Sequence, residues 1–593
     1  MKIPIKFDLR KAINLRIFQR WAVVLLILLP VILGAVYIRF FGVNVVFWDQ
    51  WDFIPYIEKL FNNNLSIYDL FQQHNEHRLF FPRIIMLILA YLTSYNNIYE
   101  MYFSWCLSIF ILVLIFLMYR NSFGDSTKSL LVFIPISFMV FDFRQFENIL
   151  WGFQLQVYLC VLGFILSIYM LEKSNNFNLN FLLAVFGGVL ASYSFANGLA
   201  AWPTGLFFIL ISNKGKKLAI IWSLFGLLAA GLYFYNWIRP PDHPSPYVII
   251  EQPIKGLIFL IANIGSPLAA QISVAVIIGS FLVVILFLEL IILLKYNYII
   301  ETAKWLSFIL FSLLSTLTMA IGRAGFGSEQ ALVSRYVTIT FLSIIGIYLL
   351  ALNIYIKISG GRVYSFLSVI TISIIIIGVT AGYITGLEEG KSTSDFRTQD
   401  AYYLETCKLQ TDNNLKNLYP SPEVVRERVK FLEKYKLNVF SNVGVNISRL
   451  TESDDNTLGY VGYVDAINGH IMNYNNISKR ISFPINRSET DEIIINGWAV
   501  DRLANTSAKA VFIMIDNNLT IPTLYNLDRS DVARAFNNKE LRYSGFEGSF
   551  AISNLNNGVH NLTLKVVSQR GDKIFNIDPD IQIAVKDGIR VAL

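Results

Sequence analysis

The sequence predicts a polytopic α-helical membrane protein that carries a β-sandwich domain outside the membrane. Three observations predict this fold class. Hydrophobic residues make up 54% of the 593 residues and charged residues make up 15%. Apolar runs of the roughly 20 residues needed to cross a bilayer recur from Trp21 to Ile384 and stop before Glu388. Short β-type runs separated by Asn, Asp and Gly turns follow from about Gly459.

These patterns divide the chain into three predicted parts. Residues 1–386 form a transmembrane domain, residues 387–450 a helical connector, and residues 451–593 an immunoglobulin-like β-sandwich. In the connector, Ser421 before Pro422 is typical of a helix start. The apolar residues that follow it share one helix face, namely Val425, Val429 and Leu432. The predicted strands are Ile493–Val500, Val511–Ile515, Phe550–Ile552 and Leu562–Val567.

Charge and cysteine content narrow the class of protein further. Six Lys and Arg residues among the first 20 predict a cytoplasmic N-terminus and a multi-pass protein of the cytoplasmic (inner) membrane. The net charge of +7 lies largely in short loops between apolar runs, so it does not indicate a nucleic-acid partner. Two of the three cysteines lie in apolar segments, which leaves no disulfide framework or cysteine metal site.

The apolar runs predict about eleven crossings. Two shorter runs, Leu79–Thr93 and Gly256–Ala269, are interpreted as surface or re-entrant segments. This parity places ten cations in inner loops and five in outer loops, and it puts the C-terminal domain outside the cytoplasm. The predicted spans are Trp21–Phe41, Met101–Met118, Ser129–Phe141, Leu155–Met170, Phe181–Ala196, Gly198–Ser212, Leu218–Trp237, Ile272–Leu294, Trp305–Ile321, Tyr336–Leu352 and Phe366–Ile384.

The stretch Val46–Arg83 is the densest group of titratable residues near the membrane. It follows the first span and holds Asp49, Asp52, His74, Glu76, His77, Arg78 and Arg83. This mixture favours a reaction site over a linker. The alternative is an amphipathic hairpin on the membrane surface, with tryptophans as interface anchors. His74, Glu76 and His77 are weak candidate ligands for a divalent metal ion, because three ligands this close rarely complete a site.

Other predicted outer loops add charged groups on the same side. One carries Arg144 and Glu147, and another carries Arg323, Arg335 and Tyr336. A single charged helix end can simply be solvated, but several on one face favour a site. A carboxylate can take a proton from a hydroxyl, and a guanidinium can hold a phosphate as leaving group. Nucleotide sugars are cytoplasmic, so an outward-facing site for sugar transfer needs a lipid-linked donor.

The motifs WDQWD, QHNEHRLFFPR, FENILWGFQ and GRAGFGSEQALVSRY resemble those of uncharacterised bacterial members of the GT-C class of membrane glycosyltransferases. The architecture from Met1 to about Ile384 also resembles that class. The resemblance implies an inverting transfer in which Asp49 acts as base or orients the acceptor, with Asp52 as the competing choice and Glu147 at the second acidic position. It implies that Arg323 or Arg335 contacts phosphate. Further candidate substrate-binding residues are His74, Glu76, His77, Arg78, Arg83, Arg144 and Tyr336.

The C-terminal motifs INGWAVD, LDRSDVARAF, SGFEGSF and NNGVHNLTLKV resemble a small β-sandwich module appended to many bacterial surface-polysaccharide proteins. One interpretation is a carbohydrate-binding module with Trp498, Tyr525 or Arg529 as contacts. The favoured interpretation is that Trp498 is a core tryptophan of the sandwich.

The sequence therefore predicts transfer of a monosaccharide from a polyprenyl-phosphate donor to an envelope glycan or glycolipid on the outer face of the membrane. A lipid-linked saccharide flippase or exporter is the first alternative. It calls for repeats and buried mid-span charges, and the sequence interpretation identifies neither. A non-catalytic anchor that displays a carbohydrate-binding module is the second alternative. Replacing Asp49 with Asn should abolish transfer in the first case and be silent in the last.

Overall fold

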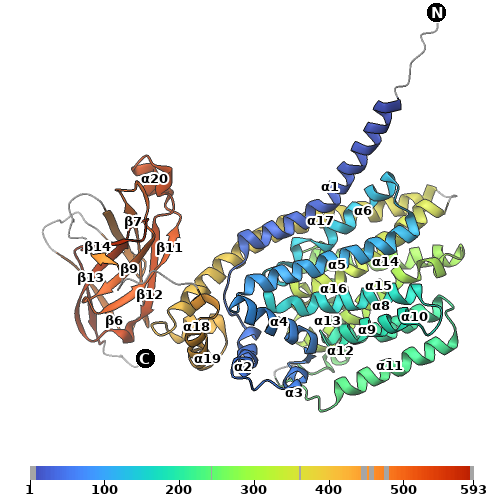
Figure 1. The fold of residues 1–593 in the computed structure, drawn as a ribbon, viewed down its shortest axis with the longest axis horizontal. Helices are drawn as coiled ribbons and strands as arrows, with labels where there is room; N and C mark the ends of the chain where they lie inside the picture. The colour runs from blue at the N-terminus through green and yellow to red at the C-terminus, as the bar shows by residue number, and fades with distance from the viewer. Residues whose placement is uncertain are drawn as a thin grey trace, which may run out of the picture. The chain divides into compact units, whose positions relative to one another are not determined.

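The computed structural model describes residues 9–241, 244–358, 362–441, 450–452, 460–472 and 480–587 (Figure 1). It divides into two compact units. The helical unit comprises Met1–Val43, Lys59–Thr93 and Asn97–Ser394. The mixed unit comprises Asn44–Glu58, Ser94–Asn96 and Asp395–Leu593. The three-part division drawn from the sequence stays a prediction.

Nine helices among the described residues are long and apolar enough to cross a membrane. The long apolar runs of the sequence form them, since a helix satisfies its own backbone hydrogen bonds in lipid. Three of these stretches include short flanking helices. The elements are α1 (Leu9–Phe41), α5 (Asn97–Phe123), α6 (Thr127–Val140) with α7 (Phe146–Leu150), α8 (Leu155–Lys173), α11 (Lys216–Phe234), α14 (Ile272–Lys295), α15 (Ile299–Arg323), α16 (Ser334–Lys357) and α17 (Arg362–Glu405).

Four shorter apolar helices complete the described bundle: α4 (Phe80–Thr93), α9 (Leu179–Ser192), α10 (Ala201–Ile211) and α13 (Pro253–Gly265). Nine of the eleven predicted spans correspond to long helices. The other two fall on α9 and α10, which at 14 and 11 residues are short for a bilayer core of about 30 Å. The eleven crossings and the two re-entrant segments stay predictions.

Small residues allow close helix packing in this unit. α8 and α9 lie along each other, as do α15 and α16 (Figure 1). A Cβ atom on Gly163 of α8 would lie 2.7 Å from the Gly187 carbonyl oxygen of α9, so glycine is required for this approach. α16 is the most enclosed long helix, with 94% of its apolar window buried.

Short elements connect the helices at the end of the unit that carries the candidate site. They are α3 (Ile67–Phe71), β1 (Gln73–His74), β2 (His77–Arg78), η1 (Phe143–Gln145), η2 (Gly152–Gln154), η3 (Ala196–Ala200), α12 (Val248–Glu251), η4 (Ser266–Leu268), η5 (Ala324–Phe326) and η6 (Ser328–Leu332).

The mixed unit begins with helices. α2 (Asp49–Phe61) starts in it, and α18 (Asp412–Leu418), α19 (Pro422–Tyr435) and η7 (Asn438–Ser441) follow α17. The predicted helix start at Pro422 is confirmed. Its apolar face is confirmed too, since Val425, Val429 and Leu432 are buried.

Two β-sheets form the rest of the mixed unit. One has the order β10-β9-β13-β14-β3, with β15 and β6 attached, and the other has the order β11-β12-β7-β4-β5, with β8 attached. Ile495 and Val464 from one sheet share a core with Ile513 and Leu564 from the other, which makes a β-sandwich. The strands are β3 (Thr451–Glu452), β4 (Tyr460–Ile467), β5 (His470–Ile471), β6 (Ile481–Asn486), β7 (Glu492–Asp501), β8 (Thr506–Ser507), β9 (Ala510–Ile515), β10 (Leu519–Pro522), β11 (Leu524–Leu527), β12 (Gly545–Ala551), β13 (Gly558–Val567), β14 (Lys573–Ile577) and β15 (Ile581–Lys586).

The favoured interpretation of Trp498 as a sandwich core residue is wrong. Successive side chains of a strand point to opposite faces, and in β7 the core positions are Ile493, Ile495 and Ala499. Trp498 points to the other face. There it packs beside Val532 of α20 (Ser530–Ala535), and η9 (Lys539–Leu541) contributes to the same small cluster.

Candidate functional site

The centre of the candidate site is the two-stranded hairpin formed by β1 and β2. His74 pairs with His77 across it, and Asn75 adopts a φ of 47°, which suits the tight turn. The Gln73 side chain accepts a hydrogen bond from Ile238 N and donates one to Ile238 O. The Tyr233 hydroxyl donates to the carbonyl oxygen of Glu76 at 2.7 Å. The hairpin is therefore fixed to the end of α11.

Arg78 and Arg83 hold backbone around this hairpin. The Arg78 guanidinium donates to the carbonyl oxygens of Phe71, Tyr233 and Tyr235. Arg83 is buried and donates to the carbonyl oxygens of Asp69, Leu70 and Gln72 at the C-terminal end of α3. The last carbonyls of a helix lack partners within the helix, so Arg83 acts there as a cap. The structure gives both arginines, which the sequence suggested as substrate contacts, a role in positioning the hairpin.

Glu76 and Arg323 form the first ion pair of the site. Arg323 Nη2 lies 2.7 Å from Glu76 Oε1, and His77 Nε2 lies 3.7 Å from the same oxygen. The other ring nitrogen of His77, Nδ1, accepts a hydrogen bond from the Ala196 backbone N–H at 3.1 Å, and the ring stacks on Phe195. Because Nδ1 accepts, the proton of a neutral His77 is on Nε2 and faces Glu76.

His74 is turned toward a different part of the site. Its ring meets the edge of Phe153 with the centroids 5.4 Å apart. Within the described ranges, no three His, Cys, Asp or Glu side chains are grouped in a way that could hold a metal ion. The divalent ion considered from His74, Glu76 and His77 therefore gains no support from the geometry.

Glu147 and Arg335 form a second, looser pair. The Ser334 hydroxyl donates to Glu147 Oε2 at 2.6 Å, and Arg335 Nε lies 3.7 Å from Glu147 Oε1. The Arg335 guanidinium lies over the Trp151 ring, 5.7 Å from its centroid. Among the described residues, Arg335 Nε is buried and has no hydrogen-bond partner. The Arg335 side chain as a whole is 37% exposed, so its terminal N–H groups can still meet an anionic ligand.

Tyr336 lies near both pairs. The residue is 9% exposed, and the charges of Arg323, Arg335, Glu76 and Glu147 are all within electrostatic range of its hydroxyl. The four charged side chains remain between 25% and 37% exposed. Elements distant in the sequence thus bring two carboxylates and two guanidinium groups into one accessible cluster, which we call the Tyr336 cluster.

Arg144 lies beside this cluster, but its guanidinium already forms a hydrogen bond within the protein. It is buried, and its Nη2 donates to the Leu332 carbonyl oxygen at 2.7 Å. Its own backbone N–H donates to Asp142 Oδ1 at 2.8 Å. Arg144 therefore fixes the loop before Ser334, and its Nε atom is buried without a hydrogen-bond partner among the described residues.

A cavity of about 830 Å³ lies next to the hairpin. Arg78 and Gln73 of the hairpin line it, together with residues of α3, α4, α9 and α11. Its volume is in the range of known ligand sites, which are mostly apolar with a few polar groups. The apolar lining includes Phe71, Phe80, Phe81, Val189, Phe225, Leu228 and Leu232.

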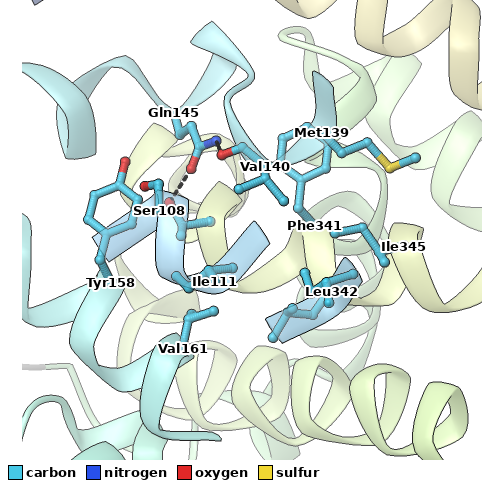
Figure 2. Close-up of a pocket in the computed structure, with 12 residues that line it drawn as sticks. Ser108, Ile111, Met139, Val140, Gln145, Tyr158, Val161, Phe341, Leu342 and Ile345 are labelled. Carbon is cyan, nitrogen blue, oxygen red and sulfur yellow. Dashed lines mark hydrogen bonds between the residues drawn. The ribbon is translucent and has the colours of Figure 1, made fainter. Parts of the chain in front are cut away.

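A second cavity, inside the bundle, is too small for a substrate. Figure 2 shows it between α5, α6, α8 and α16, and its volume is about 20 Å³. The Gln145 side chain donates to the Val140 carbonyl oxygen and accepts a hydrogen bond from Thr338. Such a space holds about one water molecule.

The two first-loop carboxylates belong to the mixed unit. Asp49 opens α2, where the helix dipole favours a negative charge. Asp52 accepts hydrogen bonds from the Tyr419 hydroxyl at 3.0 Å and from Arg428 Nη1 at 3.0 Å. Burial and the adjacent Asp52 raise the pKa of Tyr419 to about 12. In the described contacts Asp52 therefore ties α2 to α18 and α19.

The sequence interpretation missed two features. Ser334 and Trp151 support the second ion pair, although both lie in quoted motifs. Glu289 of α14, six residues before the helix ends at Lys295, is 0% exposed, so one predicted span buries an ionisable residue outside its middle. Both of its carboxylate oxygens are buried without a hydrogen-bond partner in the part of the chain that the structure describes.

Comparison with known proteins gives little further guidance. No family model matches this sequence. An uncharacterized protein of Archaeoglobus fulgidus is 26% identical over 155 residues, which is 23% of this chain. The match spans 39% of the archaeal protein, well under two thirds of its length. The name of the archaeal protein assigns no activity.

Proposed function

We propose that this protein is an inverting GT-C-type glycosyltransferase of the cytoplasmic membrane. It moves one sugar from a polyprenyl-phosphate donor to an envelope glycan or glycolipid on the outer face. The N-terminus lies in the cytoplasm in this proposal, and the β-sandwich lies outside.

The observation that carries the proposal is the incompletely used guanidinium of Arg335. It has a loose contact with Glu147, and its side chain is 37% exposed. A phosphate can accept two parallel hydrogen bonds from such a group. Arg323 brings a second guanidinium to the same cluster through Tyr336. Two cations suit the charge that develops on a phosphate leaving group.

The 830 Å³ cavity supports a lipid-linked donor in particular. Its apolar walls suit the isoprenoid chain, whereas Arg78 and Gln73 lie at the hairpin that also carries Glu76. An isoprenoid chain in this cavity brings its phosphate to the hairpin. A water-soluble nucleotide sugar has no need of an apolar cavity this large.

In the proposed step, the acceptor hydroxyl oxygen forms a bond to the anomeric carbon of the sugar. The bond from that carbon to the phosphate oxygen breaks, and polyprenyl phosphate leaves with the electron pair. In this proposal Glu147 receives the hydroxyl proton, and Asp49 is the competing base from the sequence; Ser334 and Arg335 contact the two Glu147 oxygens. Ser334, through its hydrogen bond to Oε2, acts as a positioning residue.

The test is the envelope glycan composition of cells with and without this chain, complemented by single variants. We expect one sugar to disappear without the chain, at unchanged polymer length, and Arg335→Gln to reproduce the loss at normal protein level. Arg120→Gln is the matched control, because Arg120 is an exposed arginine in the last turn of α5 and is not part of the Tyr336 cluster. Unchanged composition in cells without the chain would refute the proposal.

Asp49 is tested separately in the same cells. The sequence-based account expects Asp49→Asn to abolish transfer while the protein is still made. Retained transfer would remove Asp49 from the catalytic role and leave Glu147 as the candidate base.

One observation favours the flippase alternative. An ionisable residue buried in a membrane helix usually marks a pathway, and Glu289 is such a residue. Under that alternative, Glu289→Gln depletes whole repeat units from the envelope, whereas the transferase account expects a normal glycan.

A further inference from the structure

The outer face of the sheet β11-β12-β7-β4-β5 carries a pair of aromatic rings. Tyr463 of β4 is the register partner of Trp498 of β7, and their ring centroids are 5.3 Å apart with the planes at 31°. Tyr463 is 44% exposed. The third strand, β12, places Gly545 opposite Trp498. The two rings therefore lie side by side on this face as an aromatic surface, next to a position without a side chain.

Trp498 of this aromatic surface is fixed by packing against residues beneath it and against Phe536 beside it. Trp498 packs on the small cluster of Val500, Val532 and Leu541, which covers part of its indole. Phe536, at the end of α20, meets Trp498 edge-on with the centroids 5.6 Å apart and is 37% exposed. An anchored tryptophan keeps its orientation without a ligand, so little conformational entropy is lost on binding.

Arg529 closes the side of the surface at Gly545. A Cβ atom on Gly545 would lie 2.9 Å from Arg529 Cγ, so the glycine makes room for the arginine stem. Arg529 donates from Nε and Nη2 to Asp531 and from Nη1 to Asp465 at 2.5 Å. These bonds use three of its five N–H groups. The Asp465 and Asp531 side chains remain 42% and 59% exposed.

We propose that this face binds a neutral saccharide chain, with Tyr463 and Trp498 stacking on a sugar ring. Aromatic rings contact the C–H face of a pyranose, and carboxylates next to a guanidinium offer acceptors and donors for its hydroxyl groups. Nucleobases also stack on such rings, but the carboxylates of Asp465 and Asp531 repel a phosphate backbone. A neutral glycan is therefore the favoured occupant.

The structure also removes one residue that the sequence suggested as a contact. The Tyr525 hydroxyl donates to the Ala499 carbonyl oxygen and accepts from the Ala508 N–H, both within the sandwich. Its ring supports the strands and does not belong to the proposed face. The proposed binding does not depend on the transferase activity, because the residues of this face lie entirely in the mixed unit.

The test is binding of defined glycans by the full chain in a detergent without a sugar headgroup. The probes are linear neutral hexasaccharides of glucose, mannose or galactose, measured by isothermal titration calorimetry up to millimolar concentration. We expect at least one probe to bind. Tyr463→Ala and Trp498→Ala should each weaken that binding about tenfold, and Trp498→Phe should restore most of it.

Tyr543→Ala is the matched control, because Tyr543 is an exposed aromatic residue of the same sandwich at 51% exposure and should not affect binding. Thermal unfolding of each variant identifies any loss of fold, and exposed Tyr463 keeps the test valid if Trp498→Ala is unstable. No binding by any hexasaccharide, equal binding by the Tyr463→Ala variant, or preference for a single-stranded oligonucleotide would overturn the proposal. Sugar binding by a chain without transfer activity would refute the proposed transferase alone.

Discussion

The two ends of α15 carry ion pairs of similar composition in different surroundings. Lys304 and Arg323 are 19 positions apart on this helix, which is about 28 Å at the rise of an α-helix. At one end, Lys304 is buried, lies 2.5 Å from Glu172 Oε1 and donates to the Met118 carbonyl oxygen. At the other end, Arg323 pairs with Glu76 in the accessible Tyr336 cluster.

The difference separates a structural ion pair from a candidate binding site. The Lys304 ammonium forms its hydrogen bonds with atoms of the protein. The neighbouring Lys214 does the same, since it donates to Glu172 O and Asn175 Oδ1. Arg335, in contrast, makes a loose ion contact and keeps donor capacity. Removing a charge at the first end should therefore reduce stability, and removing one at the second should reduce activity.

The largest effect is expected for Lys304→Met. The change leaves the Glu172 carboxylate without the buried ammonium, and breaking such a pair costs about 3–5 kcal/mol. Thermal unfolding in detergent should show a clear fall in melting temperature, with unchanged transfer per folded molecule. The double variant with Glu172→Gln should recover part of the loss. A single variant as stable as the wild type would show that the pair is not structural.

The next largest effect is expected for Arg335→Gln, and it should appear in the transfer rate and not in the melting temperature. We expect the transfer rate from a short-chain polyprenyl-phosphate sugar to fall about 100-fold, the usual cost of losing one charge-stabilising donor. The melting temperature should stay near that of the wild type, because Arg335 is partly exposed and makes one loose ion contact. A stability loss that matches the activity loss would assign Arg335 to the structural class.

Asp69 stabilises α3, which precedes the hairpin, and the free energy that it contributes depends on pH. It caps α3 with Ser66, and the hydrogen bond from Lys59 is the main reason that its pKa is lowered to about 2. The folded-state pKa is below the ordinary value, so the stabilisation of about 2 kcal/mol is complete above about pH 4 and is lost as the pH falls through about 2.

Hydrogen exchange over residues 66–72, corrected for the intrinsic rate, checks this expectation. Protection should fall as the pH is lowered from about 4 toward 2, and Asp69→Asn should show the lower protection already at neutral pH. If the Asp69→Asn variant keeps full protection at neutral pH, the cap does not stabilise α3.

The smallest effect is expected for the pair of Lys357 and Glu301. The two atoms Nζ and Oε2 are 2.6 Å apart, but Glu301 is 54% exposed. An exposed pair contributes about 0.5 kcal/mol or less, so Glu301→Gln should barely change the melting temperature. A loss comparable to that of Lys304→Met would mean that burial does not explain the difference between these pairs.

Local patterns predicted much of the fold because they report which residues can be buried. The nine long helices follow apolar runs, and the strand periodicity of β7 is visible in its sequence. The face of Trp498 could not be derived in this way. A period of two defines two faces, and the outer face is partly covered by α20, which lies about 30 residues later in the chain.

The residues of the candidate site could be predicted from the sequence, but the role of each residue could not. The sequence named Glu147, Arg323, Arg335 and Tyr336, and the structure brings them together with Glu76. The sequence could not show that Arg78 and Arg83 bind backbone carbonyls, because a backbone partner is not visible in a pattern of side chains. Glu289 was overlooked within an apolar run whose composition predicted only a span.

The most direct test of the account is photolabelling of the purified chain with a diazirine-bearing polyprenyl phosphate. The account predicts labelled peptides from α3 and α11, which line the 830 Å³ cavity, and weaker labelling in the Arg335→Gln variant. Competition by unlabelled polyprenyl phosphate, but not by the free polyprenol, should remove the label. Labelling centred on α14 around Glu289, or labelling that does not depend on the phosphate, would contradict it.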